Sequence, residues 1–222
     1  MSETEERQAR DAVVRVSHAL YMRGLSPGTT GNISIRLSDG RMVVTPTSSS
    51  LGFLAASDLA LVDADGTVAK GSARPSKETA LHQVFYERAD IGAVVHLHSG
   101  WAVALSCLDQ LPDTLGRLTP YFVMKVGSLS LVPYSAPGGA EGSRLLHTHA
   151  SGHHAALLAN HGLIAAGATL LEACNVAEEI EQAARLWFAL RSEQVRTLGE
   201  DEIADLARRY PLPTGALRTY RA

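Results

Sequence analysis

The chain has 222 residues, a formal net charge of −3 at pH 7 and 45% hydrophobic residues. This length can bury a hydrophobic core, so we expect one domain over residues 1–222, and the balanced charge predicts neither a nucleic-acid nor a membrane partner. Nine histidines stand beside only two cysteines, which excludes a disulfide scaffold or a cysteine-based zinc fold and leaves imidazole as the basis of any metal site.

The polar start of the chain and its interrupted apolar stretches indicate a cytoplasmic protein. Residues 1–10 are polar and charged, without the apolar segment of a signal peptide. Histidine or asparagine interrupts the longest apolar stretches, so no membrane span is predicted. Cys107 and Cys174 lack the paired spacing of metal ligands, and we expect both to be buried free thiols.

Hydrophobic spacing divides the chain into helices and strands. Helices are predicted at residues 9–21, from residue 75 onward, and at 100–108, 139–150, 169–190 and 202–209. Strands are predicted at residues 33–37, 42–44, 59–62, 67–68, 93–98, 122–124, 129–132 and 155–159. Turn dipeptides at 39–40 and 65–66 join the first strands into hairpins. Such hairpins favour a mainly antiparallel sheet covered by helices on both faces.

Three histidines stand where predicted strands end. His96 and His98 point to the same strand face, where they could bind Zn²⁺ or simply be two polar residues on a solvated face. His161 follows an apolar strand and precedes Gly162, which permits a sharp turn, so it could aim into a crevice or be structural. Five further histidines are interpreted as structural, namely His18, His147, His149, His153 and His154.

Two kinds of segment suit an anion. Pro75-Ser76-Lys77-Glu78 opens a predicted helix, where free N–H groups, a hydroxyl and an ammonium group favour phosphate. Glu78 could instead complement the helix dipole; with His82, four residues on, it could be a rival metal ligand or orient that ring. The Gly-rich loop 28–32 and the polar run 45–50 also offer N–H groups and hydroxyls to a phosphate.

Taken in order, five motifs resemble the class II aldolase/adducin family. They are Gly-Thr-Thr-Gly-Asn-Ile-Ser, Thr-Pro-Thr-Ser, Pro-Ser-Lys-Glu, His-Leu-His-Ser and Asn-His-Gly-Leu. The resemblance implies an α/β fold, a three-layer α/β/α sandwich around a mainly antiparallel central sheet, assembled as a homotetramer with active sites between subunits. It also implies that His96, His98 and His161 bind Zn²⁺ (alternatively Mn²⁺ or Co²⁺), and that Glu78 is the acid/base residue, which can also ligate the ion.

The same resemblance assigns residues to a phosphorylated substrate, namely Asn32, Thr47, Ser48, Ser76 and Lys77. Tyr121 resembles a catalytic tyrosine that reaches a neighbouring subunit's site. Residues 47–54, 96–99 and 118–122 are similar to 3-oxo-tetronate 4-phosphate decarboxylases. That similarity implies a carboxy-lyase of sugar-acid catabolism, which releases CO₂ and dihydroxyacetone phosphate through a metal-stabilised enediolate.

Two alternatives stay open from the sequence. One is a class II aldolase or 4-epimerase acting on fuculose or ribulose phosphate. Aldolases of the fuculose type usually carry Ser-Ser-Glu where this chain has Ser76-Lys77-Glu78, and the added cation favours a more anionic substrate. The other is a non-enzymatic, adducin-like module, but such modules have lost the metal ligands that this chain retains. Whether the substrate derives from erythronate or threonate is also open.

Overall fold

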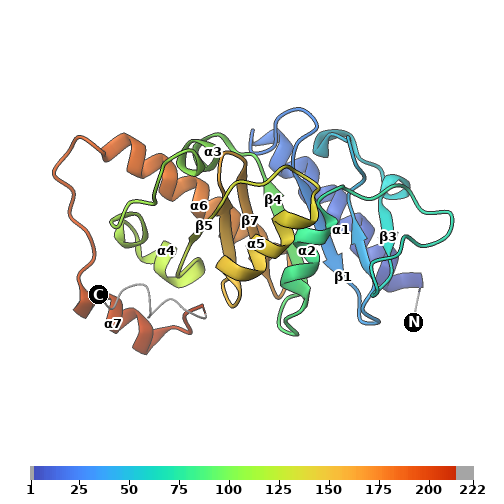
Figure 1. Ribbon diagram of the computed structural model, residues 1–222. Helices are drawn as coiled ribbons and strands as arrows, with labels where there is room; N and C mark the ends of the chain where they lie inside the picture. Colours follow the sequence, from blue (N-terminus) through green and yellow to red (C-terminus); the bar gives the residue numbers. More distant parts are fainter. Residues whose placement is uncertain (1–2, 214–222) are drawn as a thin grey trace.

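A seven-stranded mixed sheet forms the centre of the molecule (Figure 1). In the computed structural model, which describes residues 3–213, the strand order is β3-β2-β1-β4-β7-β6-β5. All neighbouring pairs are antiparallel except β5 and β6. The strands are β1 (Asn32–Arg36), β2 (Met42–Val44), β3 (Ala60–Val62), β4 (Ala93–Leu97), β5 (Ser130–Val132), β6 (Ala155–Leu158) and β7 (Gly162–Gly167). The expectation of a mainly antiparallel sheet is confirmed.

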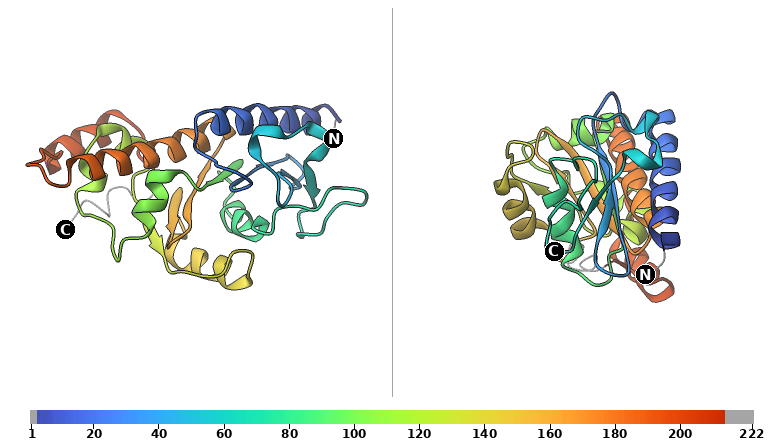
Figure 2. Two further views of the ribbon diagram at one scale, coloured as in Figure 1. Left: turned by 90° about the horizontal axis from the view of Figure 1, so that it is seen from above. Right: turned by 90° about the vertical axis from the view of Figure 1, so that its right-hand side faces the viewer.

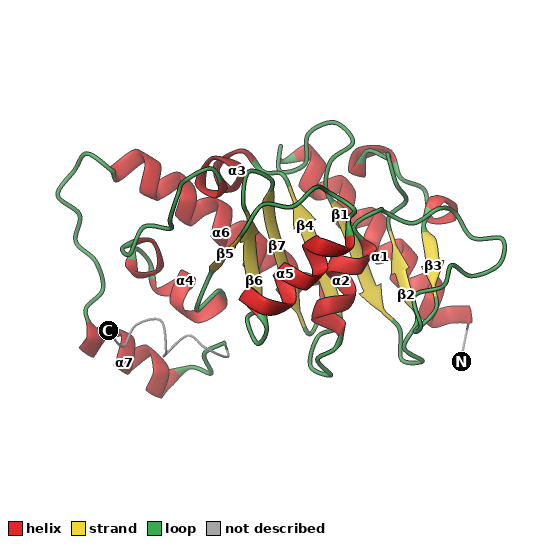
Figure 3. Cartoon of the chain, in the orientation of Figure 1, coloured by secondary structure: helices red, strands yellow, loops and turns green. Residues whose placement is uncertain are grey.

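Helices cover both faces of this sheet, which confirms the three-layer α/β/α arrangement. Helices α1, α3 and α6 lie on one face, whereas α2 and α5 lie on the other (Figures 2 and 3). The helices are α1 (Glu3–Met22), α2 (Thr79–Tyr86), α3 (Gly100–Ser106), α4 (Pro120–Lys125), α5 (Ala140–Ala150), α6 (Leu170–Leu190) and α7 (Glu200–Arg209). Among these described helices, none is both long and apolar enough to cross a membrane.

The side chains of β4 divide the core into two layers. Val95 and Leu97 belong to the hydrophobic cluster beneath α1, α3 and α6, while Val94 belongs to the cluster shared with α2 and α5. Alternation along a strand explains the division, and each fully buried aliphatic side chain contributes about 1.5–3 kcal/mol to stability. His96 has the parity of Val94, so its ring emerges on the face covered by α2 and α5.

Some local predictions were wrong. Residues 122–124 form part of helix α4, because Thr119 accepts a hydrogen bond from the Phe122 amide and Pro120 occupies the first turn, which together start a helix. No strand forms at 67–68, where Val68 makes only an isolated bridge to Val62. Cys107 is a free thiol, as expected, but it is exposed.

Helix α2 begins later than its predicted start at Pro75. Glu78 immediately precedes its first residue, Thr79, and Ser76 and Lys77 lie in the preceding turn. Pro75 is held instead by an isolated bridge to Pro46, within the polar run 45–50. This bridge brings the two predicted anion-binding segments together.

Candidate metal centre and substrate pocket

The three strand-end histidines meet at one edge of the sheet. His96 is the fourth residue of β4, and His98 follows directly after that strand. His161 is the last residue of the turn that joins β6 to β7. Because β4 and β7 are paired, with Leu97 opposite Leu163, the ends of these strands carry the imidazoles to the same place.

Glu78, directly before the first residue of helix α2, completes the cluster. Its Oε2 lies 3.4 Å from His96 Nε2, and its Oε1 lies 3.3 Å from His161 Nε2. His96 Nε2 and His98 Nε2 are 3.0 Å apart. The ligand atoms of all four residues lie within 4.8 Å of one another. Three imidazole nitrogens and a carboxylate at this spacing can hold a divalent metal ion.

The electrostatics of the cluster fit a cation. Burial, reinforced by the neighbouring rings, lowers the pKa of His96 well below its usual value. Burial and then the His161 ring lower the pKa of His98 to about 4. The pKa of His161 is also lowered, chiefly by burial, so all three rings are neutral and have lone pairs to donate at pH 7.

Two further observations test whether the residues suit a metal. His96 Nδ1 lies 2.7 Å from the Leu163 carbonyl oxygen, so Nδ1 carries the proton and Nε2 presents its lone pair to the cluster. Glu78 Oε1 is buried and has no hydrogen-bond partner among the described residues. A buried carboxylate oxygen without a donor is costly, and a cation at the centre of the cluster removes that cost. The donor set therefore fits a divalent ion.

A polar pocket of about 340 Å³ opens beside this cluster. Its wall includes Glu78, His98 and His161 together with the residues that the sequence assigned to the substrate, which are Asn32, Thr47, Ser48, Ser76 and Lys77. Ser76 is held in place because its Oγ accepts a 3.2 Å hydrogen bond from the Glu78 amide. Hydroxyls and one ammonium group thus face the candidate metal centre across a space large enough for a small phosphorylated acid.

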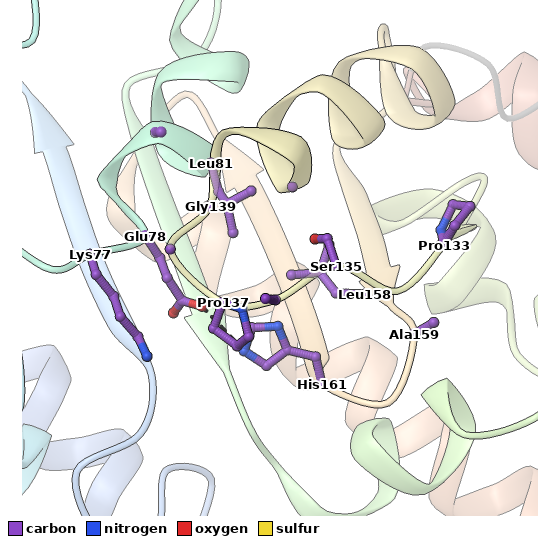
Figure 4. Close-up of a pocket in the computed structure, with 14 residues that line it drawn as sticks. Lys77, Glu78, Leu81, Pro133, Ser135, Pro137, Gly139, Leu158, Ala159 and His161 are labelled. Atoms are coloured by element: carbon purple, nitrogen blue, oxygen red, sulfur yellow. Dashed lines mark ion pairs between the residues drawn. The ribbon is translucent and has the colours of Figure 1, made fainter.

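A loop between β5 and α5 contributes Pro137 to this pocket and was not anticipated from the sequence. Figure 4 shows Glu78 and His161 pointing toward one another beneath this loop. Gly138 has a φ of 81°, and a Cβ there would lie 3.1 Å from Lys77 Cβ. The Pro-Gly-Gly sequence at 137–139 was the available signal, because it marks a tight turn directly before a helix.

Asn32 stands between Glu78 and His82. Its Nδ2 donates to Glu78 Oε2 over 2.9 Å, and its Oδ1 lies 2.5 Å from His82 Nε2. The expected relation between Glu78 and His82 on one helix face therefore runs through an asparagine of strand β1. His82 is outside the cluster that can hold a metal.

The remaining predicted residues lie elsewhere. Tyr121 is on α4 with 58% of its surface exposed, and it does not line the pocket beside the cluster. Its role at a neighbouring subunit stays a prediction. The five histidines interpreted as structural do not join the metal-binding cluster of the described residues, and they lie on α1, on α5 and just before β6.

Comparisons with known proteins agree with this geometry. The model of the family described as Class II Aldolase and Adducin N-terminal domain matches residues 11–188. The chain is 40% identical over 203 residues to the 3-oxo-tetronate 4-phosphate decarboxylase of Haemophilus influenzae. This match covers 90% of this chain and 96% of that protein. It is 34% identical over 201 residues to a 5-methylthioribulose-1-phosphate/5-deoxyribulose-1-phosphate aldolase of Rhodospirillum rubrum, with 87% of each chain covered.

A solved structure gives the same result. The crystal structure of YgbL from Klebsiella pneumoniae superposes with a TM-score of 0.85 at 40% identity, and the match covers 90% of this chain and 98% of that one. The family match spans most of the chain and contains all four residues of the candidate metal centre. The chain belongs to the class II aldolase and adducin family.

Proposed function

We propose that this protein is a zinc-dependent decarboxylase that converts 3-oxo-tetronate 4-phosphate into dihydroxyacetone phosphate and CO₂. The observation that carries the proposal is an imidazole–carboxylate metal centre beside a pocket lined by Lys77 and several hydroxyl side chains, among them Thr47, Ser48 and Ser76. Relatives named for this reaction, at about 40% identity over 90% of the chain, support it. The imidazole-rich donor set favours Zn²⁺ over Mg²⁺ or Ca²⁺.

The substrate is a β-oxo acid with a phosphate on C4. His96, His98 and His161 would hold the ion, with Glu78 beside it. When bound, the ion would supply a Lewis acid for the oxygens on C2 and C3. We place the phosphate against Thr47, Ser48, Ser76 and Lys77, so that binding energy at the far end orients the C1–C2 bond for cleavage.

The reaction requires a carbanion to form at C2 and then to be protonated. As the C1–C2 bond breaks, CO₂ leaves and the electron pair stays on C2, where a proton completes the product. Glu78 lies between His96 and His161, only 5% exposed, and is the residue we assign to that proton transfer.

We also propose that the chain acts as a homotetramer, with Tyr121 reaching the site of a neighbouring subunit. Its exposed position on α4, away from the pocket of its own chain, supports that arrangement. Light scattering of the purified protein tests the assembly, and a monomer with full activity would contradict it. Tyr121→Phe should then lower kcat while the assembly stays intact.

A class II aldolase or 4-epimerase is the second candidate, supported by the relative named as a 5-methylthioribulose-1-phosphate/5-deoxyribulose-1-phosphate aldolase. One experiment separates the two. The metal-loaded protein is incubated with each 3-oxo-tetronate 4-phosphate stereoisomer and, in parallel, with fuculose 1-phosphate and ribulose 5-phosphate. Dihydroxyacetone phosphate and CO₂ in equal amounts from one tetronate stereoisomer support the decarboxylase, whereas cleavage or epimerisation of a sugar phosphate without CO₂ from either isomer contradicts it.

A further inference from the structure

A series of buried polar side chains leads from Glu78 into the protein, away from the pocket. Asn32 connects Glu78 to His82 through the two hydrogen bonds given above. On the other side of the ring, His82 Nδ1 lies 2.7 Å from Ser34 Oγ, and Ser34 Oγ lies 2.7 Å from the Tyr86 hydroxyl. We call Asn32, His82, Ser34 and Tyr86 the relay.

The relay arises from the periodicities of one helix and one strand. Glu78, His82 and Tyr86 are spaced four residues apart, so they share one face at the start and along the length of α2. Asn32 and Ser34 are two residues apart on β1 and share one strand face. Each strand residue therefore fits between two helix residues, and the contacts alternate from element to element.

The proton positions in the relay follow from its two ends. A carboxylate only accepts hydrogen bonds, so Asn32 turns its NH₂ group to Glu78 and its carbonyl oxygen to His82. His82 Nε2 must then carry the proton, and in a neutral ring Nδ1 accepts from the Ser34 hydroxyl. Ser34 Oγ in turn accepts from the Tyr86 hydroxyl. One direction of donation satisfies every contact in the relay.

Burial keeps the relay in this single arrangement. Asn32, Ser34 and His82 are all buried, and a flipped Asn32 amide would break both of its contacts, at about 1–3 kcal/mol for each group left unsatisfied. Burial lowers the pKa of His82 to about 3, which keeps the ring neutral at pH 7. Burial also raises the pKa of Tyr86, so the tyrosine keeps its proton.

The relay holds one oxygen of Glu78 and leaves the other for chemistry. Oε2 is bonded to Asn32, whereas Oε1, which lies 3.3 Å from His161 Nε2, has no hydrogen-bond partner among the described residues. Rotation of the carboxylate would lose the bond to Asn32. Asn32 borders the pocket, but its carbonyl oxygen and one N–H of its NH₂ group are bonded inside the relay, which fixes the plane of its amide.

We propose that the relay is a positioning device for Glu78, and that Asn32 acts on this carboxylate rather than on the substrate phosphate. His82, Ser34 and Tyr86 are positioning residues, because they reach Glu78 only through Asn32. The catalytic consequence rests on the proposed decarboxylation. The hydrogen-bond arrangement itself does not.

The test compares His82→Leu with His153→Leu. His153 is a partly buried histidine with a serine partner, Ser128, at 3.0 Å, and it is outside the relay. We expect His82→Leu to lower kcat for decarboxylation roughly tenfold to a hundredfold with KM changed less than about threefold. His82→Gln, which keeps an N–H donor, should recover part of kcat, and His153→Leu should leave kcat unchanged.

Two outcomes of these assays would overturn the proposal. One is a folded His82→Leu protein with unchanged kcat. The other is a large rise in KM with kcat retained, which would return Asn32 to the substrate. If His82→Leu does not fold, Tyr86→Phe serves instead, because it removes only the last hydroxyl of the relay. It should lower kcat severalfold at constant KM, and unchanged kcat would count against the relay.

A spectroscopic measurement is independent of any reaction. In the metal-free protein labelled with ¹⁵N-histidine, NMR should show the His82 ring with its proton on Nε2 and an accepting Nδ1, and Ser34→Ala should shift the Nδ1 signal. A proton on Nδ1 overturns the relay. If the parent protein releases no CO₂ from either stereoisomer, the proposed function fails while this tautomer measurement still decides for or against the hydrogen-bond arrangement.

Discussion

Replacement of Gly162 by alanine tests how the sheet builds the candidate metal centre. Gly162 follows His161 and is the first residue of β7. A Cβ at this position would lie 2.4 Å from the carbonyl oxygen of Leu97, the last residue of β4. Because the obstacle is backbone, no side-chain rotation can relieve the overlap, and the two strand ends must separate.

The magnitude follows from that overlap. Ordinary Cβ contacts begin at 3.4 Å, so Gly162→Ala must shift one strand end by about 1 Å. Overpacking of this kind costs about 1–3 kcal/mol of unfolding free energy. The shift also moves His161 relative to His98, and metal–ligand distances tolerate only about 0.2 Å. We therefore expect zinc affinity to fall at least about tenfold.

Gly100→Ala is the matched control. Gly100 begins α3 and nothing lies within 4 Å of its ideal Cβ, so alanine should change stability by less than about 1 kcal/mol and leave zinc affinity unchanged. Urea unfolding of the metal-free proteins measures stability, and competition with a chelator measures affinity. A Gly162→Ala protein with parental stability and zinc affinity would refute the reasoning about the strand contact.

Four other predictions concern charge, metal binding and protonation. Lys77→Ser should raise KM for 3-oxo-tetronate 4-phosphate roughly tenfold to a hundredfold, because the ammonium group is placed against the phosphate, and should weaken binding of the unphosphorylated acid much less. Equal effects on both molecules would contradict that placement. Glu78→Gln should retain metal while kcat falls by about 10²–10⁴, and full turnover by this variant would argue against Glu78 as the acid/base residue. His98→Ala should lose metal and activity together. Metal analysis and initial rates measure both effects. The metal-free chain should lose stability as the pH falls below about 6.5, because the unfolded chain protonates His82 there while burial lowers the folded pKa to about 3. By pH 4.5 this histidine alone should cost about 3 kcal/mol in urea unfolding, and constant stability from pH 7.5 to 4.5 would exclude this linkage.

The candidate site could be predicted from the sequence where short periodicities decide the geometry. Strand parity put His96 and His98 on one face, and the glycine after His161 marked the turn that places its ring. The helix start at 75 was wrong because residues 75 and 76 pair with the distant residues Pro46 and Thr45. The strand at 122–124 was wrong because a local cap outweighed propensity. Thr119 capped α4 despite the β-forming residues that follow it.

The relay could not be predicted because it depends on which helix lies on which strand. The four-residue spacing of Glu78, His82 and Tyr86 is visible in the sequence, as is the two-residue spacing of Asn32 and Ser34. The local sequence pattern does not predict that these two faces meet, or in which register. That information comes from the tertiary fold, in which β1 pairs with β4 and α2 packs across them.

The most direct test of the proposed function follows the carboxyl carbon. Substrate labelled with ¹³C at C1 is incubated with protein of measured zinc content, and NMR follows the label with and without a chelator. We predict one equivalent of ¹³CO₂ and bicarbonate per dihydroxyacetone phosphate from one stereoisomer, and none after zinc is removed. Label that stays in a carboxylate with both stereoisomers, while the same sample cleaves a sugar phosphate, would contradict the decarboxylase and support the aldolase.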